Sequence, residues 1–385
     1  MQITVKTLFG LENFLAEELK SIGVQDIEIG NRVVYCKGDL RSLYAINLKS
    51  RLALRVLTPI LTFRAHNETV LYKRIRRYRW TDLIDLEQTF AINSAIFSDI
   101  FTHSKYISLK VKDAINDQFR DKYDGRRPSI DIKNPDISID VHCIGKEFTI
   151  SLDSSGSSLH RRGYRQSKRT APLNEVLASG MIIASDWTAD QALYDPMCGS
   201  GTLLVEAYHI ANKIAPGLNR DHFAFMNWSD YNAELWKELC EEASNEIESH
   251  QLSLYGSDIN GIQINETIEL LTALNLQDQI TLKQGDFAEL PAPHVRGVII
   301  TNPPYDERIK SDDIIGLYQS IGDTLKAKYD GWEAWIISGN KAAIKRIGLR
   351  TSKKMTLYNG SIECKFHKYE MYSGSKKSKT TPESE

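Results

Sequence analysis

The chain has 385 residues, of which 42% are hydrophobic and 25% charged, a composition typical of soluble globular proteins that excludes a largely disordered or membrane-embedded chain. Its formal net charge is -2, but residues 1–170 contain 28 Lys and Arg against 20 Asp and Glu, whereas the remainder contains 20 against 30. The first half is therefore +8 and the second -10, which suggests that a polyanion docks on the first half, although two ordinary domains with different surfaces would look the same.

Neither a membrane segment nor a metal site is expected. No apolar run approaches the roughly 20 residues that a bilayer span needs, and Glu12, Glu17 and Glu18 stand where a signal peptide would be apolar. The five cysteines are far apart and form no C-x-x-C pair, which argues against a disulfide framework and against zinc. A cytoplasmic protein with free thiols is the expectation.

The first half reads as α+β. A strand over residues 2–7 precedes a helix over residues 11–22, which Gly23 ends, and short strands and helices follow to about residue 150. Residues 73–80, KRIRRYRW, mix cations with aromatic rings, which suits phosphates and unstacked bases. A solvated helix face is the alternative. The expected RNA contacts here are Lys73, Arg74, Arg76, Arg77 and Arg79.

In the second half strands and helices alternate, which predicts a parallel sheet with helices on both faces. Near its end, two extended runs flank Asn359-Gly360, the strongest short hairpin signal, so an antiparallel pair should close the sheet. The strands are expected over residues 192–194, 253–256, 280–283, 298–301 and 334–337, and the hairpin over residues 353–358 and 361–371.

The first of these strands ends in Asp195 and turns through Gly199 and Gly201 into a helix over residues 203–214. The glycines permit a tight turn and let a ligand lie against bare backbone. Leu204 replaces the third glycine of a dinucleotide fingerprint, and no Gly-Lys-Ser/Thr follows, which disfavours phosphate ligands. A carboxylate at the strand tip suits instead the cationic amino group of S-adenosylmethionine.

Two further acids follow later strands. Asp258 could accept both hydroxyls of a ribose, or it could cap a helix. Asp286 could accept a hydrogen bond from the adenine amine while Phe287 covers a face of the adenine ring. Equally, Asp286 could be a turn residue and Phe287 a core residue beside it.

The strand over residues 298–301 runs into Asn302-Pro303-Pro304-Tyr305. Two prolines hold the backbone and remove N–H donors, which leaves carbonyl oxygens free to accept hydrogen bonds. Acceptance of the two amine protons by Asn302 and the Pro303 carbonyl would localise charge on an exocyclic nitrogen for attack. Tyr305 would stack on the base. These four residues are the expected catalytic group.

Asp195 to Thr202, together with Asn302 to Tyr305, resemble the cofactor loop and catalytic tetrapeptide of class I amino-methyltransferases, which modify adenine N6, cytosine N4, glutamine N5 or guanine N2. The tetrapeptide alone does not indicate which of these targets is modified. HRRGYR at residues 160–165, APLNE at residues 171–175 and LYNGSIEC at residues 357–364 resemble the THUMP-containing large-subunit rRNA guanine-N2 methyltransferases.

This resemblance covers nearly the whole chain. It implies a ferredoxin-like piece (residues 1–60), a THUMP RNA-binding domain (61–165) and a Rossmann-like methyltransferase domain with a seven-stranded sheet (166–372). Residues 373–385 contain nothing to bury and are expected to form a disordered tail. The resemblance also implies an extra helical insertion over residues 214–250. Arg161, Arg162 and Arg165 stand just before the methyltransferase domain and could guide RNA between the halves. Some family members carry a second methyltransferase domain after the first, whereas this chain is expected to end too soon for one, so any second modification would need a separate partner enzyme.

The expected function is guanine-N2 methylation of large-subunit rRNA with S-adenosylmethionine as cofactor. Adenine-N6 methylation of DNA or RNA is the rival enzyme activity, and a non-catalytic ribosome assembly factor is the rival of another class. The carbon-methylating relatives use a cysteine after the fourth strand, whereas Cys198 lies in the cofactor loop, where it is expected to pack. The expected cofactor contacts are Pro172, Asp195, Pro196, Cys198, Gly199, Ser200, Gly201, Thr202, Asp258, Asp286 and Phe287.

Overall fold

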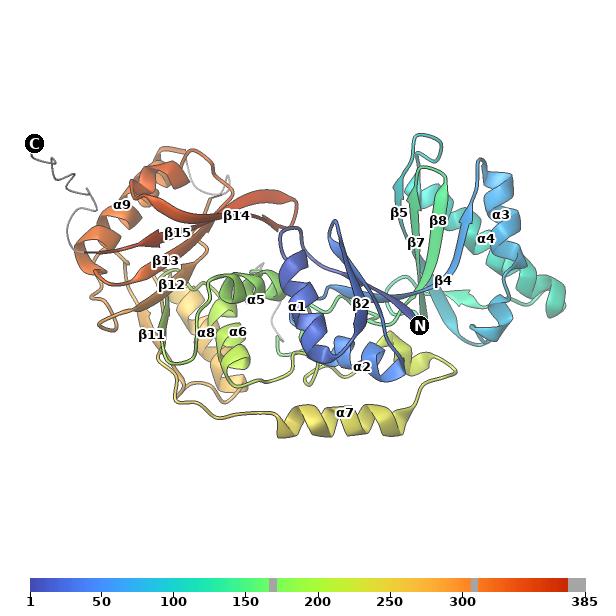
Figure 1. The fold of residues 1–385 in the computed structure, drawn as a ribbon, viewed down its shortest axis with the longest axis horizontal. Coiled ribbons are helices and arrows are strands. Elements are labelled where there is room, and N and C mark those ends of the chain that lie inside the picture. Colours follow the sequence, from blue (N-terminus) through green and yellow to red (C-terminus); the bar gives the residue numbers. More distant parts are fainter. Residues whose placement is uncertain (166–171, 306–310, 373–385) are drawn as a thin grey trace, which may run out of the picture. The chain divides into compact units, whose positions relative to one another are not determined.

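A computed structural model of the chain describes residues 1–165, 172–305 and 311–372, apart from the side chains of residues 311–313. The chain forms two compact units (Figure 1): Met1–Ser167 with Asn212–Glu248, and Lys168–Ala211 with Ser249–Glu385. The tail predicted at residues 373–385 lies outside the described residues. Within the described ranges, no helix combines the length and the apolar character that a membrane span needs.

The first unit contains one mixed sheet with the strand order β2-β3-β1-β4-β8-β7-β5-β6. Its strands are β1 (Gln2–Lys6), β2 (Gln25–Gly30), β3 (Val33–Lys37), β4 (Arg55–Arg64), β5 (Thr89–Phe97), β6 (Ser129–Ile130), β7 (Ile137–Ile144) and β8 (Glu147–Asp153). Its helices are α1 (Glu12–Ile22), α2 (Leu40–Lys49), α3 (Glu68–Arg77), α4 (Ser104–Lys122) and α7 (Ala233–Asn245), with short 3-10 turns at Trp80–Asp82 and Ala224–Asn227.

The long strand β4 joins the two parts of this sheet. Its first residues, Arg55 to Leu57, pair with β1, and from Leu57 to Arg64 it pairs with β8. The boundary that the sequence suggested at residue 60 therefore falls inside a single strand. Because β4 pairs with strands of both parts of this sheet, the ferredoxin-like and THUMP parts share a continuous hydrogen-bonded ladder.

The segment Asn212–Glu248 belongs to the first unit, although the sequence placed it as an insertion of the methyltransferase domain. The ring of Tyr44 on α2 stacks on Phe225 with centroids 4.3 Å apart, and Trp236 on α7 meets Tyr44 edge-on at 6.0 Å. Arg41 on α2 forms ion pairs with Glu242 and Glu238 on α7. Aromatic packing of this kind holds α7 against α2.

The second unit has the sheet order β11-β10-β9-β12-β13-β15-β14, in which β11 to β13 run parallel and β15 and β14 are antiparallel. Figure 1 shows α9 on one face of this sheet and α5, α6 and α8 on the other. Its strands are β9 (Ala192–Asp195), β10 (Leu254–Asp258), β11 (Ile280–Gln284), β12 (Gly297–Thr301), β13 (Glu333–Ser338), β14 (Thr351–Asn359) and β15 (Ile362–Glu370). Its helices are α5 (Glu175–Ala184), α6 (Thr202–Ala211), α8 (Gly261–Ala273) and α9 (Ser311–Lys328), with a 3-10 turn at Ile344–Ile347.

The predicted fold class is confirmed: every strand expected in the second half is present, and the Asn359-Gly360 turn joins β14 to β15 as an antiparallel hairpin. Strands β9, β10, β12 and β13 are parallel, so their carboxyl ends meet at one edge of the sheet. The strand order reverses direction between β9 and β12, which is where open α/β sheets bind their ligands.

Candidate active site

A direct hydrogen bond brings the two sequence motifs together at this edge. Thr301, the last residue of β12, donates from Oγ1 to Oδ1 of Asp195, the last residue of β9, at 2.8 Å. The Met197 N–H donates to the same oxygen at 3.2 Å. Asn302 follows Thr301 directly, so the Asn-Pro-Pro-Tyr segment starts beside the glycine loop.

The Asp195 carboxyl group is buried without a cation. It is 2% exposed, and in the described part of the chain no Lys, Arg or His forms an ion pair with it. Burial raises the pKa of this carboxyl group to about 7. The hydrogen bonds from Thr301 and Met197 lower the pKa, but their effect is smaller than that of burial. Oδ2 accepts no hydrogen bond from the described residues. A buried carboxylate requires a compensating positive charge, so this site suits a cationic ligand.

The glycine loop packs against α8. Gly201 has a φ of +74°, and a Cβ there would lie 2.6 Å from Thr267 Cγ2 on α8, so only glycine fits. Thr267 donates from Oγ1 to the Gly199 carbonyl at 2.6 Å, and the Gly199 N–H donates to Asp258 Oδ2 at 3.0 Å. The loop is thus tied to β10 as well as to β9. Gly199 has a φ of +51°, and a Cβ added to it would have no atom closer than 3.7 Å. The space next to the Gly199 Cα, where a side chain would lie, is therefore open.

The two later acids differ in their surroundings. Each oxygen of Asp258 accepts one backbone N–H, from Gly199 and from Asn260, and each retains a lone pair for a ribose hydroxyl. Asp286, two residues after the end of β11, is exposed, and its Oδ1 accepts from the Ala288 N–H at 2.8 Å.

Phe287 is a core residue and does not present a ring face to a ligand. It is 5% exposed, and its ring lies 5.2 Å from that of Tyr329 and 6.2 Å from that of Tyr194. Ile259, which follows Asp258 and was not among the residues expected at the site, is 68% exposed. An apolar residue directly after the acid at a strand end is the sequence signal that could have drawn attention to it.

The other expected cofactor contacts are less informative. Cys198 is buried against Gly256, and burial raises the pKa of its thiol, which fits a packing role rather than a nucleophile. Pro172 is exposed just before α5. Pro196 and Thr202 are buried at the two ends of the glycine loop, and Ser200 is half-buried between them.

Asn302 presents an unsatisfied acceptor. Its side-chain Oδ1 is buried and accepts no hydrogen bond from the described residues. An orphaned buried polar atom costs free energy unless a ligand or water satisfies it. Pro303 is buried, and its carbonyl accepts no hydrogen bond from the described residues. The end of β12 therefore offers two neighbouring acceptors, which suits a donor with two N–H groups.

Three elements anchor the Tyr305 side chain. Asn359 Nδ2 at the hairpin turn donates to its hydroxyl at 2.7 Å, and the Cys364 thiol on β15 lies 3.6 Å from the same oxygen. A Cβ on Gly339, which follows β13, would lie 2.9 Å from two ring carbons of Tyr305. Residues 357–364 carry part of the family resemblance, but nothing in their sequence indicates that Asn359 and Cys364 contact Tyr305.

The expected RNA-binding cations of the first unit fall into two groups. Lys73, Arg74 and Arg77 on α3 are exposed and form no ion pair within the described ranges. Arg76 pairs with Asp121 on α4, and Arg79 with Asp82. Trp80, which the sequence offered as a stacking ring, is fully buried in the core.

The arginines near residue 160 are also divided. Arg162 is 3% exposed and donates to the carbonyls of Leu159 and Arg51, so it holds the backbone and cannot reach a polyanion from there. Arg161 is exposed. Arg165 is half-buried, with its guanidinium 5.7 Å from the centre of the Tyr164 ring.

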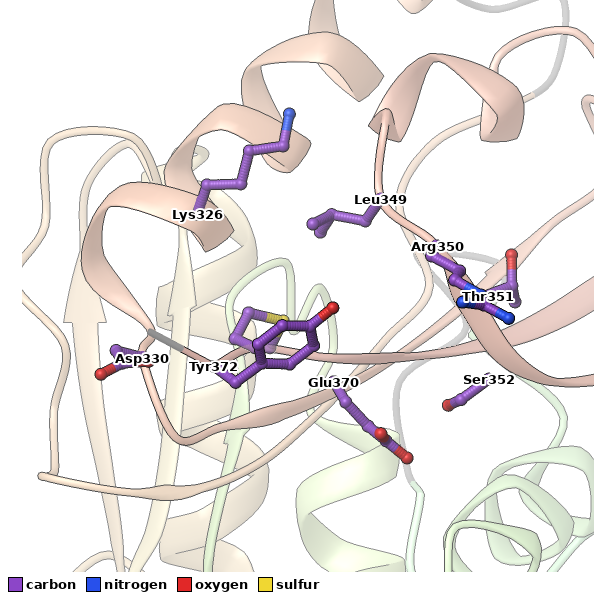
Figure 2. A pocket seen from close by; sticks show the side chains of 9 residues that line it. Lys326, Asp330, Leu349, Arg350, Thr351, Ser352, Glu370 and Tyr372 are labelled. Atoms are coloured by element: carbon purple, nitrogen blue, oxygen red, sulfur yellow. The ribbon is translucent and has the colours of Figure 1, made fainter. Parts of the chain in front are cut away.

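A separate hollow of about 640 Å³ lies in the second unit (Figure 2). Its lining includes Lys326 and Asp330 near the end of α9, Thr351 at the start of β14 and Glu370 at the end of β15. Glu370 pairs with Glu333, the first residue of β13, so this hollow lies at the opposite sheet edge from Asp195 and Asn302. None of the expected site residues lines it.

Known families match most of the chain. Residues 162–368 match the RMKL-like methyltransferase domain, residues 65–153 the THUMP domain and residues 2–57 the RlmL ferredoxin-like domain. The protein "Putative RNA methyltransferase slr0064" of Synechocystis sp. is 42% identical over 365 residues, which are 94% of this chain and 95% of that protein. "Ribosomal RNA large subunit methyltransferase K/L" of Syntrophotalea carbinolica is 37% identical over 374 residues, 94% of this chain but 52% of that protein, so the chain spans about half of its length.

Two solved structures share the fold over nearly the whole chain. The first, "SMU.472, a putative methyltransferase complexed with SAH", has a TM-score of 0.86 at 27% identity and covers 97% of this chain and 99% of that one. The second, "a predicted N6-adenine-specific DNA methylase" from Listeria monocytogenes, has a TM-score of 0.85 at 28% identity and covers 96% of each chain. With its glycine loop, its Asn-Pro-Pro-Tyr segment and its THUMP and ferredoxin-like parts, this chain belongs to the RMKL-like methyltransferase family.

Proposed function

We propose that the chain transfers a methyl group from S-adenosylmethionine to the exocyclic N2 amine of a guanine in large-subunit ribosomal RNA. The observation that carries the proposal is the unsatisfied, buried Asn302 Oδ1 next to the Pro303 carbonyl, one residue beyond the hydrogen bond from Thr301 to Asp195. The names of the K/L relatives support ribosomal RNA, and the THUMP part supports an RNA substrate.

The residues at the β9 edge fit the cofactor. Asp195 would hold the cationic amino group, the open side of Gly199 would let the ligand lie against backbone, and Asp258 would accept from the ribose hydroxyls. Asp286 and the exposed Ile259 would contact the adenine at its edge and its face. When bound, the cofactor supplies an electrophilic methyl group on a sulfonium.

The Asn302 segment would prepare the acceptor. Asn302 Oδ1 and the Pro303 carbonyl would each accept one N–H of the amine, which localises the lone pair on nitrogen and points it toward the donor. Pro304 keeps the backbone rigid, and Tyr305 would lie on the base. Once the nitrogen carries the methyl group that the cofactor would supply, it would release one of its protons to water.

The assay uses purified protein, labelled S-adenosylmethionine and large-subunit rRNA from a strain without the gene. After digestion to nucleosides, the label should run with N2-methylguanosine. Label in N6-methyladenosine would favour the rival target that the name of the Listeria neighbour suggests. Cofactor binding without any transfer would favour the non-catalytic assembly factor.

Cofactor affinity should depend on pH. The pKa of Asp195 is raised by burial to about 7, and only the ionised carboxylate pairs with the amino group, so the carboxylate is lost as pH falls through 7. Affinity should then weaken about tenfold per pH unit below 7. Calorimetry between pH 5.5 and 7.5 measures this. A flat profile would remove Asp195 from the amino-group site.

RNA binding should depend on the exposed cations of α3. Replacing Lys73, Arg74 and Arg77 with alanine should weaken RNA affinity and lower the slope of log affinity against log salt by about three, one for each lost phosphate contact. The matched control replaces Arg76 and Arg79, which are already paired with Asp121 and Asp82. An unchanged slope in the triple variant, with cofactor affinity also unchanged, would show that α3 merely faces solvent.

Two expectations remain predictions. A ribosomal substrate is compatible with the expected cytoplasmic location, and fractionation would test it. The partner enzyme for a second modification rests on the family resemblance alone, and co-purification from cells would test it.

A further inference from the structure

Tyr305 is held at its far end as well as at its backbone. Pro303 and Pro304 restrict the chain that leads to it, but a tyrosine ring can still turn about its two side-chain bonds. Its hydroxyl accepts from Asn359 Nδ2 at 2.7 Å, and the Cys364 thiol lies 3.6 Å from the same oxygen. A contact at the hydroxyl resists rotation about the Cα–Cβ bond, because that rotation would carry the oxygen away from Asn359. Rotation about the Cβ–Cγ bond leaves the oxygen in place, so it has to be limited by contacts with the ring itself.

The hairpin places both contact residues on one face. Asn359 pairs with Ile362, and Leu357 pairs with Cys364. Side chains two residues apart on a strand share a face, so Asn359 lies on the same face of the hairpin as Cys364. Gly360, with a φ of +62°, makes the tight turn that sets Asn359 at the tip.

Gly339 supplies the space for the ring. A Cβ there would lie 2.9 Å from Cδ2 and Cε2 of Tyr305 and 2.7 Å from Ile362 Cγ2. No side chain larger than hydrogen fits without moving one of them. The residue after β13 thus lets the Tyr305 ring approach the backbone, and the ring is confined between Gly339 and the hairpin tip.

We propose that Asn359 is the positioning residue of this active site: through the Tyr305 hydroxyl, and together with Gly339 and Cys364, it fixes the ring before the target base arrives. The inference rests on the proposed function, in which Tyr305 lies on the base. A ring that is already ordered adds no ordering cost when the base binds, and it keeps the amine in line with the Asn302 and Pro303 oxygens.

A double-mutant cycle tests this. Asn359→Ala and Tyr305→Phe should each lower kcat on rRNA about tenfold, because misplacement of about 1 Å is enough to cost that much or more. The double variant should be no worse than either single variant, because both remove the same contact. Asn359→Asp should recover most of the activity, since its carboxylate can accept from the tyrosine O–H. Cofactor affinity should be unchanged in all of them.

The matched control is Thr356→Ala, which removes a hydrogen bond from Lys365 on the same hairpin without touching Tyr305. It should keep wild-type kcat. Losses that multiply in the double variant, or an Asn359→Ala enzyme as fast as wild type, would overturn the positioning role.

A readout without turnover separates this inference from the proposed function. Acetylation of the Tyr305 phenol by N-acetylimidazole, followed by peptide mass spectrometry, should be slow in the wild type and several-fold faster in Asn359→Ala. If rRNA receives no methyl group but this protection is seen, the proposed function fails and the anchoring stands. Equal acetylation rates in the two proteins would overturn the anchoring itself.

Discussion

Replacing Asn302 with alanine is expected to lower the rate of methyl transfer at least about a hundredfold, while affinity for S-adenosylmethionine stays within about twofold of wild type. The buried Oδ1 has no partner among the described residues, so its removal breaks no structural hydrogen bond that could explain the loss. An acceptor that acts on the amine in the transition state should change kcat and kcat/KM together. Single-turnover kinetics and calorimetry on the same preparation measure the two quantities.

The chain offers a matched control in Asn340→Ala. Asn340 also follows a strand of the same sheet edge, but its Oδ1 already accepts from the N–H groups of Ala342 and Ala343. It should cost stability and leave the chemical step nearly unchanged. A large fall in cofactor affinity for Asn302→Ala would instead make Asn302 a structural residue of the cofactor loop.

Replacing Asp195 with alanine should abolish measurable cofactor binding, which corresponds to a loss of at least about a hundredfold. The carboxyl group has no cation among the described residues, and it accepts from Thr301 and Met197, so the ligand amine is its missing partner. Calorimetry at pH 8, where the carboxyl group is ionised, gives the largest difference.

Two further variants separate charge from structure. Asp195→Asn keeps the shape and the hydrogen bond from Thr301, yet it should lose affinity almost as fully as alanine. It should also raise the thermal midpoint of the ligand-free protein at pH 8, since it removes a buried, uncompensated charge. Asp190→Ala, at an exposed position before β9, should bind normally. Wild-type affinity in Asp195→Asn would show that the charge is not used.

Local sequence patterns were enough to predict the sheet of the second unit. Each parallel strand is a short apolar or mixed run that ends in turn chemistry, and the alternation of these runs with helices predicts the sheet without any tertiary information. The pairing of Thr301 with Asp195 follows from the same logic, because parallel strands that end together bring their last residues together.

What the sequence could not show depends on contacts between distant residues. The segment Asn212–Glu248 joins the first unit because Tyr44 and Arg41 receive its aromatic and acidic side chains. Phe287 and Trp80 are aromatic residues beside polar ones, and only the packing shows that both are core. For the same reason, the sequence could not distinguish Arg76, which pairs with Asp121, from Arg74, which forms no ion pair with any residue that the structure describes.

The most direct test compares nucleoside maps of large-subunit rRNA from cells with the gene, without it, and with the Asn302→Ala variant. If the chain methylates guanine N2 in this RNA, one N2-methylguanosine should be present with the intact gene and missing in the other two strains, with all other modified nucleosides unchanged. Identical maps in the three strains, or a difference confined to N6-methyladenosine, would contradict this activity.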